Sequence, residues 1–214
     1  MMRMSKERDL KAVMDRDPAV RDEKDAKWFS QGYHAIRFHR HSNAHWHRGN
    51  YRRARLLNYI GRVLTGADIH PGATIGDDVF IDHASGVVIG ETAVIKDHVC
   101  IFQGVTLGGV SSKKGKRHPT IEENVVIGAN ATVLGDIVIG NNTRIGAGSV
   151  VVKDVPPNST VVGIPGKVIK MGGVRVDALK HDDLPDPVKE VLQEMADQLE
   201  SLKGKVERLE DGQK

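Results

Sequence analysis

The chain has 214 residues, enough for one or two domains with a hydrophobic core. Only 4% of the residues are aromatic whereas 23 are glycine, so we expect a core of small and β-branched side chains. The 31 basic and 28 acidic residues leave a net charge of +3, which gives no reason to expect a nucleic-acid or membrane-surface partner.

The single cysteine, Cys100, excludes a disulfide framework within the chain and a cysteine-based zinc site. Such cysteine usage is typical of a reducing compartment. No window approaches the roughly 18 consecutive apolar residues of a membrane span. The charged N-terminal stretch also lacks the apolar segment of a signal peptide. We therefore expect a cytoplasmic protein.

The composition divides the chain into three zones, with changes near Gly66 and Met171. Residues 1–66 are rich in His and Arg and show no strand alternation, so we expect an α-helical N-terminal domain there. The apolar anchors that we expect in these helices are Trp28, Phe29, Ile36 and Phe38.

The middle zone, residues 67–170, repeats with a period of six. A helix would need a period of 3.6, whereas six is a multiple of two, so a strand can keep each repeated residue on one face. A β-sandwich would usually repeat every 8–12 residues. We therefore predict a parallel β-helix in which three hexads form one triangular coil. The aliphatic residues of its inward ladder are Ile69, Ile75, Ile81, Ile89, Ile95, Ile101, Leu107, Ile121, Ile127, Val133, Ile139, Ile145 and Val151.

A second position of the hexad, four residues after the aliphatic one, is usually small or β-branched, as at Ser85. The repeat is interrupted twice. Two extra residues lie in the segment that contains Asp82 and His83, and eight lie in the segment that contains Arg117 and His118. Extra residues must leave a solenoid at a corner, and such insertions often carry function.

The C-terminal zone, residues 171–214, predicts a coiled-coil helix. Pro185 and Pro187 mark its entry. Because no second helical stripe lies nearby, we expect self-association, and a trimer would match a triangular solenoid. Spacings of four and three alternate along Val188, Leu192, Met195, Leu199, Leu202, Val206 and Leu209.

Three segments resemble the serine acetyltransferase family: residues 68–109, 117–135 and 145–169. Their most specific motifs are IDHASG and VTLGG…RHP, and RDPA at 16–19 resembles the serine-binding segment of that family. The resemblance implies a mixed α and β fold, with α-helices followed by a left-handed parallel β-helix. It also implies trimers or dimers of trimers that transfer acetyl from acetyl-CoA to the hydroxyl of L-serine, in a cleft between adjacent subunits.

An alkyl hydroxyl is too weakly acidic to attack a thioester unaided, so the reaction needs a base. The resemblance implies that His83 is this base and that Asp68 holds its ring and stabilises its protonated form. Asp68 lies 15 residues earlier, three short of one coil, so it can lie near the same edge. Taken alone, both residues are equally compatible with locally satisfied turns.

Serine is a zwitterion, so its site needs a cation for the carboxylate and carboxylates for the ammonium. The resemblance assigns Arg117 and His118 to the carboxylate. It assigns Asp17, followed by Pro18, and Asp82 to the ammonium. Without the resemblance, Arg117 and His118 would be read as part of a solvated basic loop.

The resemblance also places residues along acetyl-CoA. Gly109 would contact CoA through its backbone where the second insertion leaves the coil. Ala129 and Ala147 have small side chains that let the pantetheine arm approach, and Lys167 and Lys170 could meet its phosphates. No metal is expected. His41 and His45 could share a helix face as a metal pair, but the role of the histidines from His34 to His47 stays open.

Three other functions remain open on the sequence. A related hexapeptide-repeat acetyltransferase could act on a sugar, an antibiotic or homoserine. A γ-type carbonic anhydrase would need a third histidine ligand besides His83 and His118. A non-catalytic assembly protein would leave the residues at both register breaks unexplained. The resemblance implies inhibition by L-cysteine, whereas the C-terminal Lys214 departs from the isoleucine with which some relatives dock O-acetylserine sulfhydrylase, so that partner is not predicted.

Overall fold

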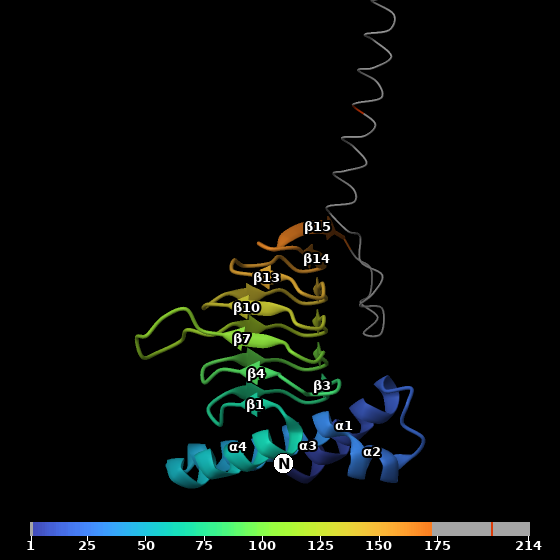
Figure 1. The fold of residues 1–214 in the computed structure, drawn as a ribbon, viewed down its shortest axis with the longest axis vertical. Coiled ribbons are helices and arrows are strands. Elements are labelled where there is room, and N and C mark those ends of the chain that lie inside the picture. Colours follow the sequence, from blue (N-terminus) through green and yellow to red (C-terminus); the bar gives the residue numbers. More distant parts are fainter. Residues whose placement is uncertain (1, 173–197, 199–214) are drawn as a thin grey trace, which may run out of the picture. The chain divides into compact units, whose positions relative to one another are not determined.

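The computed structural model describes residues 2–172 and residue 198, so the predicted coiled-coil segment, apart from residue 198, lies outside the described residues. The chain begins with helices, as the sequence predicts (Figure 1). No helix of the described part is both long and apolar enough to cross a membrane. Within residues 2–172 the helices are α1 (Met2–Arg16), α2 (Glu23–Phe29), α3 (Gln31–His47) and α4 (Tyr51–Thr65).

Short polar side chains and a glycine set the ends of these helices. The Asp22 side chain accepts a hydrogen bond from the backbone N–H of Asp25 at the start of α2. Ser30 does the same for Tyr33 at the start of α3. Gly66 ends α4 in the left-handed conformation with φ 76°, which a glycine adopts without the steric cost of a Cβ. The chain then enters its first strand at Asp68.

Three sheets follow, and up to β14 the paired strands are parallel and consecutive strands belong to different sheets (Figure 1). The A sheet has the order β1-β4-β7-β10-β13 and contains β1 (Asp68–Ile69), β4 (Val88–Ile89), β7 (Thr106–Gly108), β10 (Thr132–Leu134) and β13 (Val150–Val151). The B sheet contains β2 (Thr74–Ile75), β5 (Val94–Ile95), β8 (Thr120–Ile121) and β11 (Val138–Ile139). The C sheet contains β3 (Phe80–Ile81), β6 (Cys100–Ile101), β9 (Val126–Ile127), β12 (Arg144–Ile145), β14 (Ser159–Val162) and the antiparallel β15 (Lys167–Met171).

The predicted aliphatic ladder forms the core of this β-helix. All thirteen residues of the ladder are buried. Their stacking follows the strand register: Ile69 pairs with Ile89, and Ile89 pairs with Leu107 one coil later. Burial of these side chains removes a continuous apolar column from water and is the main favourable term in the stability of the coils.

The two register breaks lie at different corners of the coil. The first lies on the C–A edge, which we define as the corner segments that lead from each C-sheet strand to the next A-sheet strand. The second lies on the A–B edge, defined in the same way, between β7 and β8. The first break also changes which residue fills the second hexad position. Ser85, which the repeat places there, is exposed, and Ala84 and Val87 are buried in its place.

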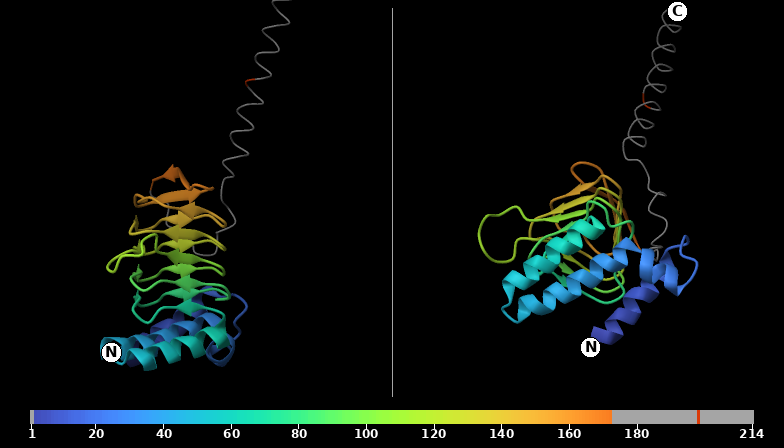
Figure 2. Two further views of the ribbon diagram at one scale, coloured as in Figure 1. Left: turned by 60° about the vertical axis from the view of Figure 1, so that its left-hand side comes forward. Right: turned by 60° about the horizontal axis from the view of Figure 1, so that its bottom comes forward.

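The helices pack against the first coils, at the β1 end of the β-helix (Figure 2). A second apolar cluster joins Leu10 and Val13 of α1 and Tyr33 of α3 to the outer face of the C sheet at Phe80 and Phe102. Space is tight where α3 meets β3. A Cβ added at Gly32 would lie 1.8 Å from the carbonyl oxygen of Ile81.

Two of the four predicted helix anchors are not anchors. Ile36 is buried and Phe38 is half-buried, but the side chains of Trp28 and Phe29 are exposed. The reason is the short length of α2, because the buried contact of this seven-residue helix is made by Ala26. Trp28 therefore lies outside the apolar cluster on the outer face of the C sheet.

Candidate active site

The A–B edge carries the more tightly built part of the candidate site. The loop after β7 leaves the coil at Gly109 and returns at Arg117 and His118. Arg117 Nη2 donates to Glu91 Oε2 over 2.5 Å. The backbone N–H groups of Arg117 and His118 both donate to Thr92 Oγ1, at 3.0 and 3.2 Å. Residues one coil earlier thus fix the returning end of the loop.

The His118 ring is held in one tautomer. The ring is buried, and its Nδ1 accepts from the backbone N–H of Thr92 at 3.2 Å and lies 2.9 Å from Thr92 Oγ1. Because a backbone N–H can only donate, the hydrogen of the neutral ring lies on Nε2. Burial lowers the pKa of His118, and the neighbouring charges of Arg117 and Lys116 lower it further. The ring is therefore a neutral Nε2–H donor near pH 7.

Two glycines leave room for the edge of this ring. A Cβ added at Gly90 would lie 2.0 Å from His118 Cδ2 and Nε2, and one added at Gly109 would lie 3.1 Å from Nε2. No side chain other than hydrogen fits at Gly90 while the ring stays in place. Gly109, which the resemblance assigns to CoA, thus lies beside Arg117 and His118, the residues expected to receive the serine carboxylate.

Glu91 positions the guanidinium of Arg117. The hydrogen bond from Arg117 lowers the pKa of the Glu91 carboxyl, so the pair is ionised near neutral pH. Both side chains remain partly exposed. Arg117 Nη2 donates to Glu91, and Arg117 Nη1 donates to the carbonyl of Gly115 at 3.3 Å. A guanidinium held on both sides is pre-oriented to receive an anion with its remaining donors.

The C–A edge carries His83 and Asp82. His83 and Ala84 are consecutive residues with positive φ, 57° and 61°, so the chain reverses sharply there. This turn directs the His83 ring outward, and the side chain is 73% exposed. Its Nε2 lies 4.0 Å from Asp82 Oδ1, which is longer than a hydrogen bond. A base in this position is open to an approaching substrate.

Asp68 contacts α4 instead of His83. Asn58 Nδ2 donates to its Oδ1 at 3.1 Å, and Arg62 Nη1 donates to its Oδ2 at 3.1 Å. Within the described part of the chain, no hydrogen bond joins Asp68 to His83. The two residues do lie close along the chain path, because the carbonyl of Gly66 accepts from Gly86 N–H in the turn that follows His83.

Asp17 and Pro18 lie after α1, beside the C sheet. The preceding Arg16 donates to the backbone carbonyl and the carboxylate of Asp78, and Val20 packs against the cluster on the outer face of the C sheet. The Asp17 carboxylate accepts from Ala19 N–H, which closes a local turn. This segment therefore belongs to the C-sheet side of the coil, together with Asp82 and His83.

Ala129 and Ala147 lie on the C–A edge, one and two coils beyond the coil of Phe102 and Gly104. Backbone bonds run along this edge, because Gly148 N–H donates to the carbonyl of Ala129. A Cβ added at Gly128 would lie 2.6 Å from the backbone nitrogen of Ala147. The edge is thus lined by small residues on the same side as His83. Lys167 and Lys170 are exposed on β15.

The predicted site residues therefore fall into two groups within one chain. Asp82 and His83 lie on the C–A edge, and Arg117 and His118 lie on the A–B edge. The A sheet separates them, and its four residues from 87 to 90 alone span roughly 13 Å at about 3.3 Å a residue. One chain does not bring the expected base and the expected carboxylate receptor together.

Glu91 and Thr92 are site residues that the sequence analysis missed. Both lie inside the IGETAV segment that carries the resemblance, but nothing in the hexad pattern distinguishes them from other corner residues. Their separations from Arg117 and His118 are both 26 residues. One coil of 18 residues plus the eight-residue insertion accounts for this separation, and that sum is the signal that could have found them.

Other reactive side chains are buried and structural. Burial lowers the pKa of His39 to about 3, so its ring stays neutral. Burial raises the pKa of the Cys100 thiol to about 12, which leaves no thiolate for nucleophilic attack near neutral pH. Among the residues that the structure describes, no group of three or more His, Cys, Asp or Glu side chains could hold a metal ion.

Comparisons with known proteins bear on this arrangement. The family model "Serine acetyltransferase, N-terminal" matches residues 1–38, and "Bacterial transferase hexapeptide (six repeats)" matches residues 118–153. A serine acetyltransferase of Bacillus subtilis is 50% identical over 206 residues, which cover 96% of this chain and 94% of that protein. The chain belongs to the serine acetyltransferase family.

Solved structures of the family have the same fold. A serine acetyltransferase of Brucella abortus in complex with coenzyme A aligns with a TM-score of 0.78 and 43% identity, over 80% of this chain and 69% of that one. A serine acetyltransferase in complex with cysteine aligns with a TM-score of 0.77 and 40% identity, over 79% and 66%. The expectation of a helical region followed by a hexapeptide-repeat β-helix is thus confirmed.

Replacement of Thr92 by valine should weaken the support of Arg117 and His118, the residues expected to receive the carboxylate of serine. Valine keeps the shape but removes the oxygen that holds two backbone N–H groups and the His118 ring. We expect the KM for serine to rise about tenfold, because roughly 1–2 kcal/mol of buried hydrogen bonding is lost. Steady-state kinetics with varied serine measure it, and Thr92→Ser should retain the parental KM. Equal KM values for Thr92→Val and the parent would contradict this role.

Proposed function

We propose that this protein transfers an acetyl group from acetyl-CoA to the hydroxyl of L-serine, giving O-acetylserine and CoA. The observation that carries the proposal is the family match over nearly the whole chain. The distribution of charged groups at the two register breaks supports a zwitterionic acceptor. A sugar, an antibiotic or homoserine remains the alternative class of acceptor.

The chemistry needs one base and one donor to the oxyanion. His83 removes the serine proton as the serine oxygen attacks the thioester carbonyl. The tetrahedral intermediate collapses with cleavage of the carbon–sulfur bond, and the imidazolium returns the proton to the CoA sulfur. The Gly109 backbone lies on the A–B edge and is proposed to contact CoA near the oxyanion. Asp68 is proposed to orient His83 once its contacts with α4 rearrange.

Serine recognition divides between the two edges. The neutral Nε2–H of His118 and the free donors of Arg117 suit the carboxylate of serine. Asp82 and Asp17 suit its ammonium group. The small residues Ala129 and Ala147 leave a path for pantetheine along the C–A edge, and Lys167 and Lys170 would meet its phosphates.

We propose that the two groups meet between adjacent subunits of a trimer. The C–A edge of one subunit would face the A–B edge of the next, so that each site combines His83 of one chain with His118 of another. We also propose that the coil is left-handed. The proposed domains are residues 1–66, 67–170 and 171–214, and the last of them contains a coiled-coil helix. The proposed assembly is a trimer or a dimer of trimers, and the proposed location is the cytoplasm.

The acceptor is tested by CoA release from acetyl-CoA with purified protein. L-serine, homoserine and a simple sugar are compared at equal concentrations. We expect release with serine to exceed release with the other two by at least about tenfold. The sugar carries neither charge, and the extra methylene of homoserine displaces its hydroxyl from His83 when both charges are at their receptors. Release with a sugar and none with serine would remove the acceptor while retaining the acetyl transfer.

Mixing of inactive chains tests the shared site. Chains that carry His83→Asn and chains that carry His118→Ala are unfolded together and refolded in equal amounts. In random trimers about a quarter of the sites would combine a native His83 with a native His118. We expect about a quarter of the parental activity from the mixture and almost none from either variant alone. An inactive mixture, with mixed trimers shown by mass, would place both residues in a site within one chain.

Cysteine should inhibit by competition with serine. It carries the same ammonium and carboxylate groups, and the thiol replaces the hydroxyl, so the same charged residues should bind it. We expect added L-cysteine to raise the apparent KM for serine without changing kcat. Asp17→Asn should weaken serine and cysteine together, and a variant that loses only one of them would contradict a common site.

A further inference from the structure

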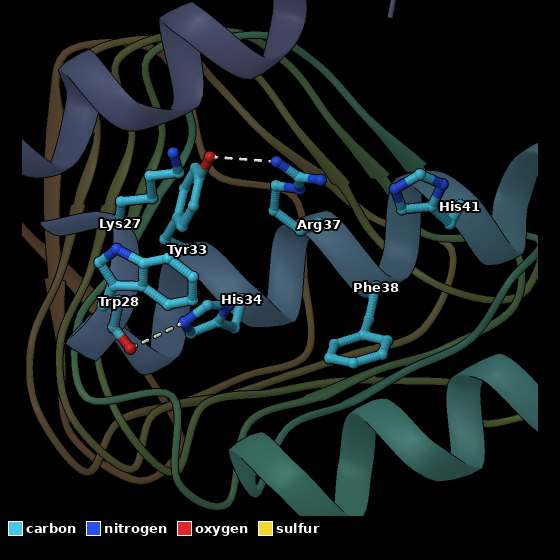
Figure 3. A pocket seen from close by; sticks show the side chains of 7 residues that line it. All are labelled: Lys27, Trp28, Tyr33, His34, Arg37, Phe38 and His41. Atoms are coloured by element: carbon cyan, nitrogen blue, oxygen red, sulfur yellow. Dashed lines mark hydrogen bonds between the residues drawn. The ribbon is translucent and has the colours of Figure 1, made fainter. Parts of the chain in front are cut away.

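A pocket of about 300 Å³ lies in the helical region, between α2 and α3, and none of its residues belongs to the candidate active site (Figure 3). Its volume is at the lower end of the roughly 300–1,000 Å³ of small-molecule sites. Aromatic and cationic side chains line it, and no carboxylate is among the described residues of its lining. The proposed acetyl transfer does not use this pocket and therefore does not explain its lining.

The walls of the pocket are flat and apolar. Trp28 of α2 forms one end, and Phe38 of α3 lies toward the other (Figure 3). Phe38 is fixed from behind by α4, because a Cβ added at Gly61 would lie 2.8 Å from the Phe38 Cβ. The Trp28 side chain is 66% exposed although Ala26 beside it is fully buried. A large indole left in water at the rim of a pocket is a common feature of ligand and partner sites.

Two cations face the same space. Arg37 Nη1 donates to the hydroxyl of Tyr33 at 3.2 Å, and Lys27 Nζ lies 5.8 Å from the centre of the Trp28 ring. Within the described part of the chain, neither cation forms an ion pair with a carboxylate. Arg37 interacts with the buried carboxylate of Asp9 through its charge, but the hydrogen bonds to both Asp9 oxygens come from Arg40, at 2.7 Å.

The half-buried guanidinium of Arg37 indicates that a ligand of this pocket would be an anion. It is partly removed from water and has one neutral hydrogen-bond partner, so a ligand anion would add charge-assisted bonds that the protein itself does not supply. Its plane and the Tyr33 hydroxyl form one side of the pocket, opposite Phe38 (Figure 3). A planar carboxylate fits a guanidinium, and the aromatic walls suit a planar ring behind it.

We propose that this pocket binds a small aromatic carboxylate, with its ring between Trp28 and Phe38 and its carboxylate toward Arg37 and Lys27. A neutral aromatic molecule would form no charge-assisted bond with either cation. An anion without a ring would leave the indole in water. The proposal is independent of the acetyl transfer, because it uses no residue of that site.

Calorimetric titration of the full-length protein tests the ligand class. The probe is 2-naphthoate, and 2-naphthamide is its neutral match in shape. We expect one naphthoate to bind per chain and the amide to bind at least about tenfold more weakly, because only the carboxylate gains charge-assisted bonds. Equal affinities for the two, or no binding of naphthoate up to millimolar concentration, would overturn the proposal.

Paired variants test the location. Arg37→Gln and Trp28→Ala should each weaken naphthoate binding at least about tenfold. The matched controls Arg52→Gln on α4 and Lys24→Gln on α2 remove exposed cations that do not line the pocket, and they should leave the affinity unchanged. Serine-dependent acetyl transfer should be unaltered in all four, which shows that they fold. Sedimentation velocity tests whether a second copy of the chain occupies this surface. If Trp28→Ala lowers the oligomer mass and the parent binds no naphthoate, the surface is a contact between copies and the proposal is overturned.

Discussion

Replacement of His83 by asparagine should reduce serine-dependent CoA release by about 10²- to 10⁴-fold, the usual loss when a general base is removed. Asparagine is chosen because His83 has φ 57°, and asparagine tolerates the left-handed region better than alanine does. The turn, and with it the path of Asp82, should therefore persist. The assay is initial-rate CoA release at saturating acetyl-CoA with varied serine.

His98→Asn is the matched control. His98 is also an exposed corner histidine with positive φ, 61°, but it lies between the B and C sheets, and its ring contacts Asp78. It should retain near-parental kcat, while both variants keep the parental circular dichroism spectrum. Similar losses in the two variants would trace the effect to the stability of the corners and would remove the assignment of His83 as the base.

The coils could be predicted from the sequence because their cause is local and repeated. Each hexad needs one aliphatic residue that points inward, and a side chain that breaks this rule leaves a void in the column. The thirteen ladder residues are therefore visible without any knowledge of pairing. Ser85 shows the limit, because two extra residues shift the local register and bury Ala84 and Val87 instead.

The candidate site was less predictable, because it depends on which corner each insertion occupies. The residue types Asp82, His83, Arg117 and His118 are visible at the register breaks. Their placement on two different edges follows only when hexads are counted in threes. The support from Glu91 comes from a residue 26 positions away, which no local pattern connects to Arg117.

The helices were the least predictable part. Burial there depends on which face of each helix meets the first coil, and the sequence does not show where that coil lies. Trp28 and Phe29 were expected inside because they are large and apolar. They are exposed because α2 is short and touches its neighbours through Ala26. The pocket beside Trp28 is a consequence of this arrangement.

Replacement of Gly90 by alanine should damage the serine site through one side chain. The new Cβ would lie 2.0 Å from His118 Cδ2 and Nε2, a separation that no structure can tolerate, so the ring must leave its place. Overpacking of this kind costs about 1–3 kcal/mol of folding stability. The displaced ring also loses its bonds to Thr92, so we expect the KM for serine to rise by at least about tenfold. Thermal unfolding and serine kinetics measure the two effects.

A double-mutant cycle locates the clash. In a His118→Ala background the ring is absent, so the additional Gly90→Ala change should lower the melting temperature much less than it does in the parent. The serine KM should stay high in the double variant, because the Nε2–H donor is missing. If Gly90→Ala is equally destabilising in both backgrounds, the alanine conflicts with the backbone of the A–B edge. In that case Gly90 would shape the corner and would not serve as the space reserved for the ring that receives the serine carboxylate.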